Sequence, residues 1–182
     1  MTRIGLFYGS STSHTEFVAY DLRDTLNALL QEDAVEVHNV GTTDAETMNR
    51  YALLIFGIPT WNIGELQDDW DIFWADLEKV DFTDKKVALF GLGDQYGYPD
   101  TFQDAMGILA EEVLALGGEL VGAWSTAGYE FEESLALSAD RQAFMGLALD
   151  EDHQSDQTGE RIRQWAIQVL TEFGLLEKVG AA

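Results

Sequence analysis

The sequence predicts an α/β protein built around a doubly wound, parallel sheet with helices on both faces. Short apolar runs alternate with amphipathic stretches along the chain, which is typical of repeated βαβ units. The length of 182 residues suits one domain, so residues 1–182 are expected to fold as a single unit. The absence of cysteine excludes a disulfide framework, an iron–sulfur cluster and a thiolate zinc site.

The first half of the chain predicts three strands with two helices between them. Residues 3–8 are an apolar strand, and the helix after it has apolar residues at three- and four-residue spacing: Val18, Leu22, Leu26, Leu29 and Leu30. The second strand is marked by Val35, Val37 and Val40, and residues 44–51 indicate a short helix. The most apolar strand, residues 53–58, is expected to end at Pro59, because proline has no N–H for a strand ladder.

The second half continues the alternation with one interruption. Residues 67–79 and 101–116 indicate helices, the second closed by Gly117 and Gly118, and residues 87–90 form the strand between them. Residues 120–124 begin a fifth strand, and residues 146–149 form another strand-like run after a long loop at 125–145. A last helix starts near Asp156 and ends at Gly174. Four tryptophans are expected in the core: Trp70, Trp74, Trp124 and Trp165.

The negative charge of the chain limits the classes of partner. Ten Lys and Arg residues against 33 Asp and Glu residues give 10 − 33 = −23. Such a charge repels phosphate backbones and anionic membrane surfaces, so we expect no nucleic acid and no membrane partner. A basic protein remains possible as a partner. The apolar run at the start of the sequence is too short for a signal peptide or a membrane span. We therefore expect a cytoplasmic protein.

Three loops follow apolar strands and should meet at one edge of the sheet, because open α/β sheets bind ligands at the carboxyl ends of their strands. The first loop, GSSTSHT at residues 9–15, opens a helix and is rich in hydroxyls. Helix amides and hydroxyls can hold a phosphate without a lysine. Taken alone, these residues are better explained as helix caps and turn residues than as a phosphate site. A nucleotide hydrolase is disfavoured because the loop matches neither GxxxxGK[ST] nor GxGxxG.

The other two loops carry aromatic side chains. Trp61 follows the third strand, and Tyr96 and Tyr98 lie between glycines after the fourth strand. Aromatic residues on both sides of a cleft, above a phosphate loop, favour a flat ring system linked to a phosphate. Trp61 and Tyr98 are therefore expected in a binding site and not in the core.

Other chemistry finds little support in the sequence. The three histidines are scattered, so no catalytic residues are expected. The segment DEDHQSD resembles the start of a calcium loop, but Ser155 stands where glycine is required and Arg161 where the bidentate glutamate belongs. No metal site is therefore expected. A phosphoryl-accepting receiver domain is rejected because the first strand ends in Tyr8, Gly9 and Ser10 and offers no clustered acids.

Four segments together resemble the flavodoxins, specifically the long-chain group: IGLFYGSSTSHTE, PTWNIGELQDDW, GDQYGYPDTFQDAMG and GLALDEDHQSD. The resemblance spans the whole chain. It implies a three-layer flavodoxin-like fold with five parallel strands in the order 2-1-3-4-5, the fifth split by the insertion at 125–145. It also implies one FMN, no metal, and low-potential transfer of single electrons between redox proteins, with the flavin cycling between semiquinone and hydroquinone.

The resemblance also assigns cofactor-binding residues. The phosphate loop corresponds to six residues: Ser10, Ser11, Thr12, Ser13, His14 and Thr15. Trp61 and Tyr98 match the aromatic residues that sandwich the isoalloxazine ring, and Asn62 and Ile63 match the turn at its edge. In the family the carbonyl at the position of Asn62 turns toward the reduced flavin, and Gly64 should permit this movement. The remaining matches are Pro59, Thr60, Gly93, Asp94, Gln103 and Asp150.

Two positions depart from the family pattern. Ser13 stands where glycine is common, and His14 replaces another polar residue, so phosphate binding could differ.

The implied partners are basic redox proteins, such as a ferredoxin/flavodoxin–NADP reductase, and a low-potential electron acceptor, with the chain a monomer. The alternative is a flavodoxin-like NAD(P)H:quinone oxidoreductase, although Trp61 over the ring would block a nicotinamide. A flavin-free binding module is the third possibility.

Overall fold

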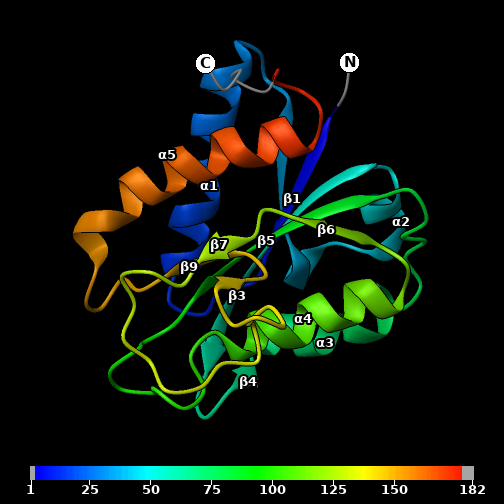
Figure 1. Cartoon of the computed structure of the whole chain (residues 1–182). Coiled ribbons are helices and arrows are strands. Elements are labelled where there is room, and N and C mark those ends of the chain that lie inside the picture. Colours follow the sequence, from blue (N-terminus) through cyan, green and yellow to red (C-terminus); the bar gives the residue numbers. More distant parts are fainter. Residues whose placement is uncertain (1–2, 178–182) are drawn as a thin grey trace.

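A parallel sheet forms the centre of the molecule in the computed structural model, which describes residues 3–177 (Figure 1). Its main strands run in the order β2-β1-β3-β5-β6, and the short β4 and β9 pair with β3 and β5. The strands of this sheet are β1 (Ile4–Tyr8), β2 (Val35–Asn39), β3 (Leu53–Trp61), β4 (Glu65–Leu66), β5 (Lys86–Leu92), β6 (Glu119–Val121) and β9 (Leu147–Leu149). Because β4 is a two-residue addition, the expected order 2-1-3-4-5 is confirmed.

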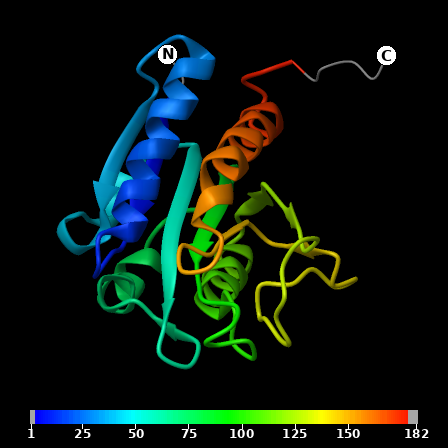
Figure 2. The ribbon, with the colours of Figure 1, turned by 90° about the vertical axis from the view of Figure 1, so that its left-hand side faces the viewer.

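Helices cover both faces of the sheet and make a three-layer fold. The helices are α1 (His14–Leu30), α2 (Ala45–Asn49), α3 (Asp68–Leu77), α4 (Asp104–Ala115) and α5 (Ser155–Glu172), with a 3-10 turn η1 (Val40–Thr42) after β2. Figure 2 shows α1 and α5 next to each other on one face. The other face is covered by α3 and α4 (Figure 1).

Each face of the sheet has its own apolar core. The first core joins α1 and α5 to alternate residues of the strands, with Leu22 and Trp165 fully buried. The second core joins α3 and α4 to the opposite residues of the same strands, with Trp70 and Phe56 fully buried. Strands buried on both faces explain why the apolar runs were continuous in the sequence. Of the four tryptophans expected in the core, Trp70 and Trp165 are buried, whereas Trp74 and Trp124 are only partly buried.

The second and fifth strands are shorter than the sequence predicted. Val40 belongs to η1 and not to β2, because the Asn39 side chain accepts a hydrogen bond from Gly41 N and turns the chain. The fifth strand ends at Val121, because Gly122 takes a φ of 83°. Beyond it, β7 (Trp124–Ser125) leaves the main sheet and pairs with β8 (Ala143–Phe144) in a separate two-stranded ribbon.

The expected end of the third strand at Pro59 was wrong. β3 continues through Pro59 to Trp61, and Pro59 pairs with Leu92 of β5. Proline is tolerated here because pairing between β3 and β1 stops at Gly57, so beyond that residue β3 has an open edge. The extension carries Trp61 past the end of β1 and starts the β3–β4 hairpin.

The segment at 125–145 divides the fifth strand of the sheet, as the sequence predicted. β6 pairs with the first half of β5, and β9 pairs with its second half. Between them the insertion packs on α4, where Gly107 leaves room for the Leu135 carbonyl: a Cβ on Gly107 would lie 2.4 Å from that oxygen. The yellow segment in Figure 2 shows this insertion beside the carboxyl-end loops.

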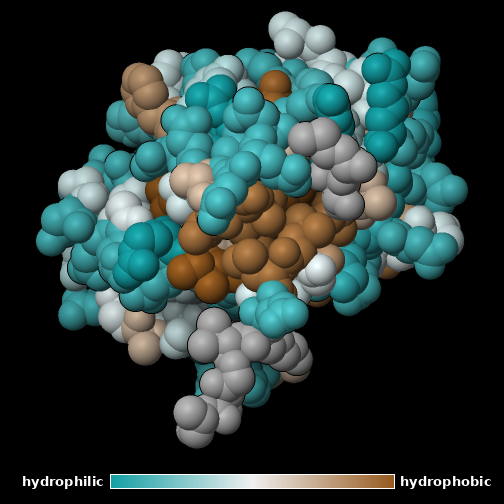
Figure 3. Space-filling model, turned by 90° about the horizontal axis from the view of Figure 1, so that it is seen from above, coloured by the Kyte–Doolittle hydropathy of each residue, from teal (hydrophilic) through white to brown (hydrophobic). Residues whose placement is uncertain are grey.

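An apolar patch lies on the face that is seen when the molecule in Figure 1 is viewed from above. Figure 3 shows apolar side chains gathered in its middle and hydrophilic ones around them. Near the ends of α1 and α5, Leu30 and Leu175 are partly buried and pack against the core between these helices. Within residues 3–177, every helix is too short or too polar to span a lipid bilayer.

Candidate functional site

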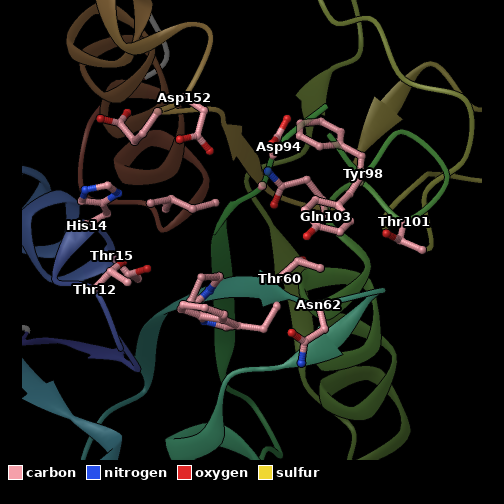
Figure 4. Close-up of a pocket in the computed structure, with 16 residues that line it drawn as sticks. Thr12, His14, Thr15, Thr60, Asn62, Asp94, Tyr98, Thr101, Gln103 and Asp152 are labelled. Carbon is pink, nitrogen blue, oxygen red and sulfur yellow. The ribbon is translucent and has the colours of Figure 1, made fainter. Parts of the chain in front are cut away.

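A cavity of about 270 Å³ opens where β1, β3 and β5 end. All three loops singled out in the sequence contribute to it, together with the loop between β9 and α5. Figure 4 shows Thr12, His14 and Thr15 on one side of this cavity, with Tyr98 and Gln103 on the other. The lining residues are Thr12, His14, Thr15, Pro59, Thr60, Trp61, Asn62, Leu92, Gly93, Asp94, Tyr98, Thr101, Phe102, Gln103, Glu151 and Asp152.

The loop between β1 and α1 presents free donors to the cavity. Ser13 precedes α1 in a left-handed conformation, with φ at 68°, and its side chain makes no capping hydrogen bond. The first-turn amides of α1 are therefore left without a side-chain partner. The Ser10 hydroxyl oxygen is buried without a hydrogen-bond partner, whereas Ser11 Oγ accepts a bond from Gln67 Nε2 at 3.2 Å.

The β3–β4 hairpin brings Trp61 and Asn62 to the cavity. Trp61 pairs with Glu65 across a three-residue turn, and Asn62 Nδ2 donates to a Glu65 carboxylate oxygen at 2.6 Å. Asn62 has a φ of 46° and Gly64 a φ of 79°, so the turn depends on unusual backbone conformations. Gly64 is also required by space, because a Cβ there would lie 2.8 Å from Asp104 Oδ2. Trp61 Nε1 is buried but has no hydrogen-bond partner.

The loop between β5 and α4 supplies the other aromatic side chain. Tyr98 is 48% exposed at the cavity, as expected for a residue outside the core. Gln103 ends the loop with a φ of 63° and is fully buried. Its Nε2 donates to Leu149 O at 3.1 Å, but its Oε1 has no partner.

Three of the residues predicted as ligands, Ser13, Asn62 and Gln103, are strained in the same way. All three have a positive φ without being glycine, a conformation that costs of order 1 kcal/mol or more. Each lies in a different loop beside the cavity. Gln31, Asp84 and Arg141 have the same conformation without lining the cavity, so positive φ alone does not mark the site. In these three loops it fixes the path of the backbone beside the cavity.

The sequence model for "Flavodoxin" matches residues 6–165.

The chain belongs to the flavodoxin family.

Curated flavodoxins are close relatives over almost their full length. A flavodoxin from a Nostoc species is 51% identical over 173 residues, which cover 95% of this chain and 98% of that one. Flavodoxin 2 from Escherichia coli K12 is 45% identical over 170 residues, covering 93% and 96% of the two chains. The crystal structure of Fusobacterium nucleatum flavodoxin bound to flavin mononucleotide matches with a TM-score of 0.85 at 33% identity, covering 94% of this chain and 99% of that chain.

Membership of the flavodoxin family confirms the resemblance found in the sequence. The structure places most of the predicted cofactor-binding residues in the lining of the cavity. The predicted residues that line the cavity are Thr12, His14, Thr15, Pro59, Thr60, Trp61, Asn62, Gly93, Asp94, Tyr98 and Gln103. The remaining predicted residues lie nearby without lining it: Ser10, Ser11, Ser13, Ile63, Gly64 and Asp150. Their individual roles in binding stay predictions.

Asp150 follows β9 and makes several hydrogen bonds within the protein. It is completely buried, and its carboxylate accepts hydrogen bonds from Gln95 Nε2 at 2.8 Å and from the backbone N–H groups of Gln95, Asp152 and His153. These bonds shape the loop between β9 and α5. The next two residues, Glu151 and Asp152, line the cavity.

Five lining residues were not identified from the sequence: Leu92, Thr101, Phe102, Glu151 and Asp152. Leu92 to Phe102 belong to the strand end and loop that were recognised, so the signal for them was their position. Glu151 and Asp152 follow a strand that pairs with the central β5. The carboxyl end of such a strand must reach the same edge of the sheet, and this rule could have found them.

The electrostatics of the cavity are dominated by carboxylates. Asp94, Glu151 and Asp152 line it, and its described lining contains no lysine or arginine. Burial alone would raise the pKa of Asp94, but hydrogen bonds from Gly97 N, His153 and Tyr96 N outweigh it and lower the pKa. Asp94 is therefore ionised at neutral pH, and the cavity carries fixed negative charge.

Proposed function

We propose that this chain is an FMN-containing carrier that passes single electrons between redox proteins at low potential. It is an electron-transfer protein and not an enzyme, in keeping with its family. The observation that carries the proposal is a set of three buried polar atoms without partners: Ser10 Oγ, Trp61 Nε1 and Gln103 Oε1. One comes from each of the three loops around the cavity, and a buried polar atom without a partner costs about 1–3 kcal/mol.

These unpartnered atoms fit the chemistry of FMN. Ser10 Oγ lies beside the free amides at the start of α1, where a phosphate would find donors and a favourable helix dipole. Gln103 Oε1 is an acceptor that suits the imide N–H of a flavin. FMN supplies a ring system that accepts and releases one electron at a time. The residues that hold it are assigned as Ser10 to Thr15, Pro59 to Gly64, Gly93, Asp94, Tyr98, Gln103 and Asp150.

Trp61 and Tyr98 give the site its shape. Both aromatic side chains line the cavity and come from opposite loops, so a flat ring can stack between them. This stacking leaves an edge of the ring open for electron transfer while covering its faces. The turn at Asn62 to Gly64 lies next to Trp61, and its strained backbone allows a peptide group to reorient when the charge in the cavity changes.

The carboxylates around the cavity favour a low potential. One carboxylate at ~10 Å, at an effective dielectric between ~20 and ~80, opposes an added electron by ~0.4 to 1.7 kcal/mol, or roughly 20 to 70 mV. Asp94, Glu151 and Asp152 line the cavity, and Glu65 in β4 and Asp68 at the start of α3 follow the loop that carries Trp61. Their effects add, so the protein makes reduction of the cofactor harder than in water.

The proposal is tested by stepwise anaerobic reduction of the purified holoprotein, followed by absorbance. We expect flavin absorbance in the oxidised protein and two separated one-electron steps in a potentiometric titration. A single two-electron step would contradict the one-electron assignment. NAD(P)H consumption with a quinone and no added reductase would instead support the oxidoreductase alternative, which family membership does not favour. A colourless protein that cannot be loaded with FMN would support the flavin-free module.

The partners are proposed to be basic proteins, such as a ferredoxin/flavodoxin–NADP reductase, together with a low-potential acceptor. An acidic rim borders the two aromatic loops: Glu65, Asp68, Asp69 and Asp100. This rim would steer a basic surface toward the cavity, and the pair must separate after each electron, which favours a small and weak interface. A monomeric carrier in the cytoplasm fits this role.

The steering role is tested by stopped-flow electron transfer from a basic reductase at several ionic strengths. The rim variant Glu65→Gln/Asp68→Asn/Asp69→Asn should associate several-fold more slowly at low salt and depend less on salt. The control Glu32→Gln/Asp33→Asn/Glu119→Gln removes the same charge from exposed positions at the other end of the sheet. Equal rates and salt slopes for the two triple variants would show that the rim does not steer the partner.

A further inference from the structure

His153 joins two loops at the rim of the cavity. It lies in the loop between β9 and α5, and its Nε2 is 2.9 Å from Asp94 Oδ1 in the loop between β5 and α4. Its ring also makes an edge contact with Tyr96, with the centroids 4.8 Å apart. Both side chains of the pair are accessible, with 36% of His153 and 26% of Asp94 exposed, so the contact can exchange protons with solvent.

Asp94 is the group through which this contact reaches the cofactor site. Its carboxylate lines the cavity, and its Oδ1 also accepts hydrogen bonds from Tyr96 N at 3.1 Å and Gly97 N at 2.6 Å. His153 therefore completes the set of donors that fixes the Asp94 side chain and the loop carrying Tyr98. Without this contact, the link between the two loops would rest on the buried bonds between Asp150 and Gln95.

The charged groups around His153 are mainly acidic. Asp94 faces His153 across the cavity rim. A ring nitrogen of His153 also lies within 4.8 Å of a carboxylate oxygen of Asp150. The insertion contributes Glu130, which accepts a bond from Tyr96 Oη at 3.2 Å. On its own loop, Glu151 and Asp152 precede it. α5 carries two cations: Arg161 is bound by the side chains of Gln154 and Gln157, and Arg163 pairs with Glu160.

A metal ion is a poor explanation for the same cluster. Asp94, Asp150 and His153 could each offer one ligand atom within 4.8 Å of the others. However, both Asp150 oxygens already accept hydrogen bonds from backbone and side-chain donors, and Asp94 Oδ1 accepts three. A cation would have to displace these donors, so the arrangement is that of a hydrogen-bonded histidine–carboxylate pair.

We propose that His153 is a positioning residue of the FMN site, whose protonated form holds Asp94 and its loop more tightly over the bound cofactor. The inference rests on the proposed FMN binding. A histidine titrates within the range of pH 5 to 8, and a charged hydrogen bond to a carboxylate is stronger than a neutral one. A loop that is held in place before FMN arrives binds it at a lower cost of ordering, so FMN should bind more tightly, and dissociate more slowly, as the pH falls from 8 to 5.5. His153 does not itself line the cavity, so it acts through Asp94.

The experiment measures FMN affinity and dissociation rate by flavin fluorescence from pH 5.5 to 8, for the wild type and for His153→Asn. The asparagine keeps a donor but cannot become charged. For a partly exposed pair, we expect the wild type to gain about two- to fivefold in affinity at pH 5.5 relative to the variant, and the two to converge at pH 8. His38→Gln is the matched control, because His38 contacts Phe7 and Tyr51 and does not line the cavity.

The possible outcomes separate the two proposals. If the wild type takes up FMN and His153→Asn shows the same pH profile, the positioning role of His153 is wrong while FMN binding stands. If the wild type itself does not bind FMN, the proposed function fails. An equal loss of affinity at every pH would make His153 a pH-independent contact and overturn the protonation step. A second variant, His153→Gln, guards against misfolding, and the unfolding curves of both apoproteins are recorded.

Discussion

The two loops that face each other across the cavity are built in different ways. The loop before α1 makes few bonds within the protein: Ser13 does not cap the helix and Ser10 Oγ has no partner. The loop between β5 and α4 is held on several sides. The Gln95 side chain donates to the Asp150 carboxylate and accepts a hydrogen bond from Glu130 N. The Pro99 carbonyl accepts hydrogen bonds from two backbone N–H groups of the insertion. At the start of α4, the Asp104 carboxylate accepts a hydrogen bond from Leu135 N at 2.8 Å.

This difference indicates how the work of ordering the site is divided. On the side of the first loop, the donors make few bonds within the protein, so the phosphate of the proposed cofactor would satisfy them. On the ring side, the protein itself fixes the backbone before any ligand arrives. The insertion at 125–145 thereby has a physical role, because it supplies several of the donors that hold the ring-side loop.

The largest expected effect follows from cutting the ring-side network at Gln95. This side chain is completely buried, donates to Asp150 Oδ2 at 2.8 Å and accepts from Glu130 N at 2.6 Å. Gln95→Leu removes the side-chain bond to the buried Asp150 carboxylate, which keeps only the backbone N–H of residue 95 on Oδ2, and the bond that ties Glu130 N to this loop. The loss of one charge-assisted and one neutral hydrogen bond should lower the free energy of unfolding of the apoprotein by about 2–4 kcal/mol. Chemical denaturation measures this, with the exposed Gln142→Leu of the insertion as control. A loss below about 0.5 kcal/mol would mean that the network does not hold the loop.

The next largest effect is expected at Trp61 and Tyr98, the two aromatic side chains proposed to stack on the ring of FMN. Trp61→Ala and Tyr98→Ala should each weaken FMN binding by about 1–3 kcal/mol, because a stacked aromatic face is lost. Fluorescence titration of the apoproteins gives the affinities. Tyr20→Ala on α1 removes an exposed aromatic residue that does not line the cavity and should leave FMN affinity unchanged. Wild-type affinity in both site variants would exclude the stacking arrangement.

The sequence predicts some parts of the molecule better than others, for physical reasons. The alternation of strands and helices was predictable, because burial on both faces of the sheet makes continuous apolar runs. The strand order came from the resemblance to the flavodoxins and not from these runs. The extension of β3 through Pro59 was not predictable, because it depends on where the neighbouring strand β1 stops. The exit of the chain at Gly122 was missed as well, although a glycine within an apolar run is a warning of a break.

The ring-side network could not be read from the sequence at all. Gln95 and Asp150 are separated by 55 residues, and Asp104 meets Leu135 across 31 residues. Polar residues in loops give no sign of which distant partner they will find. The sequence therefore contained no sign that the Asp150 carboxylate, expected at the cofactor site, accepts hydrogen bonds within the protein, and its role toward the cofactor stays a prediction.

A smaller effect is expected from relieving strain in the phosphate-side loop. Ser13 has a φ of 68°, which costs a non-glycine residue of order 1 kcal/mol. Ser13→Gly should therefore raise the free energy of unfolding of the apoprotein by about 0.5–1 kcal/mol, whereas Ser13→Ala keeps the strain and should not. Thermal or chemical unfolding of the FMN-free proteins makes the comparison. Identical stability of the Gly and Ala variants would show that the loop relaxes and that its backbone is not held for the ligand.

The smallest expected effect concerns His14, the first residue of α1. It lines the cavity on the phosphate side but is exposed, so solvent screens its charge. A protonated imidazole there attracts a phosphate, and FMN affinity should therefore rise by about two- to fivefold as the pH falls from 8 to 6. His14→Gln should flatten this part of the profile, and high salt should flatten it in the wild type. Because the phosphate itself takes up a proton near pH 6, only the difference between wild type and variant reports on His14. If the two profiles coincide, the phosphate side relies on amides and hydroxyls alone, and the contrast with the hydrogen-bonded ring-side pair of Asp94 and His153 becomes sharper.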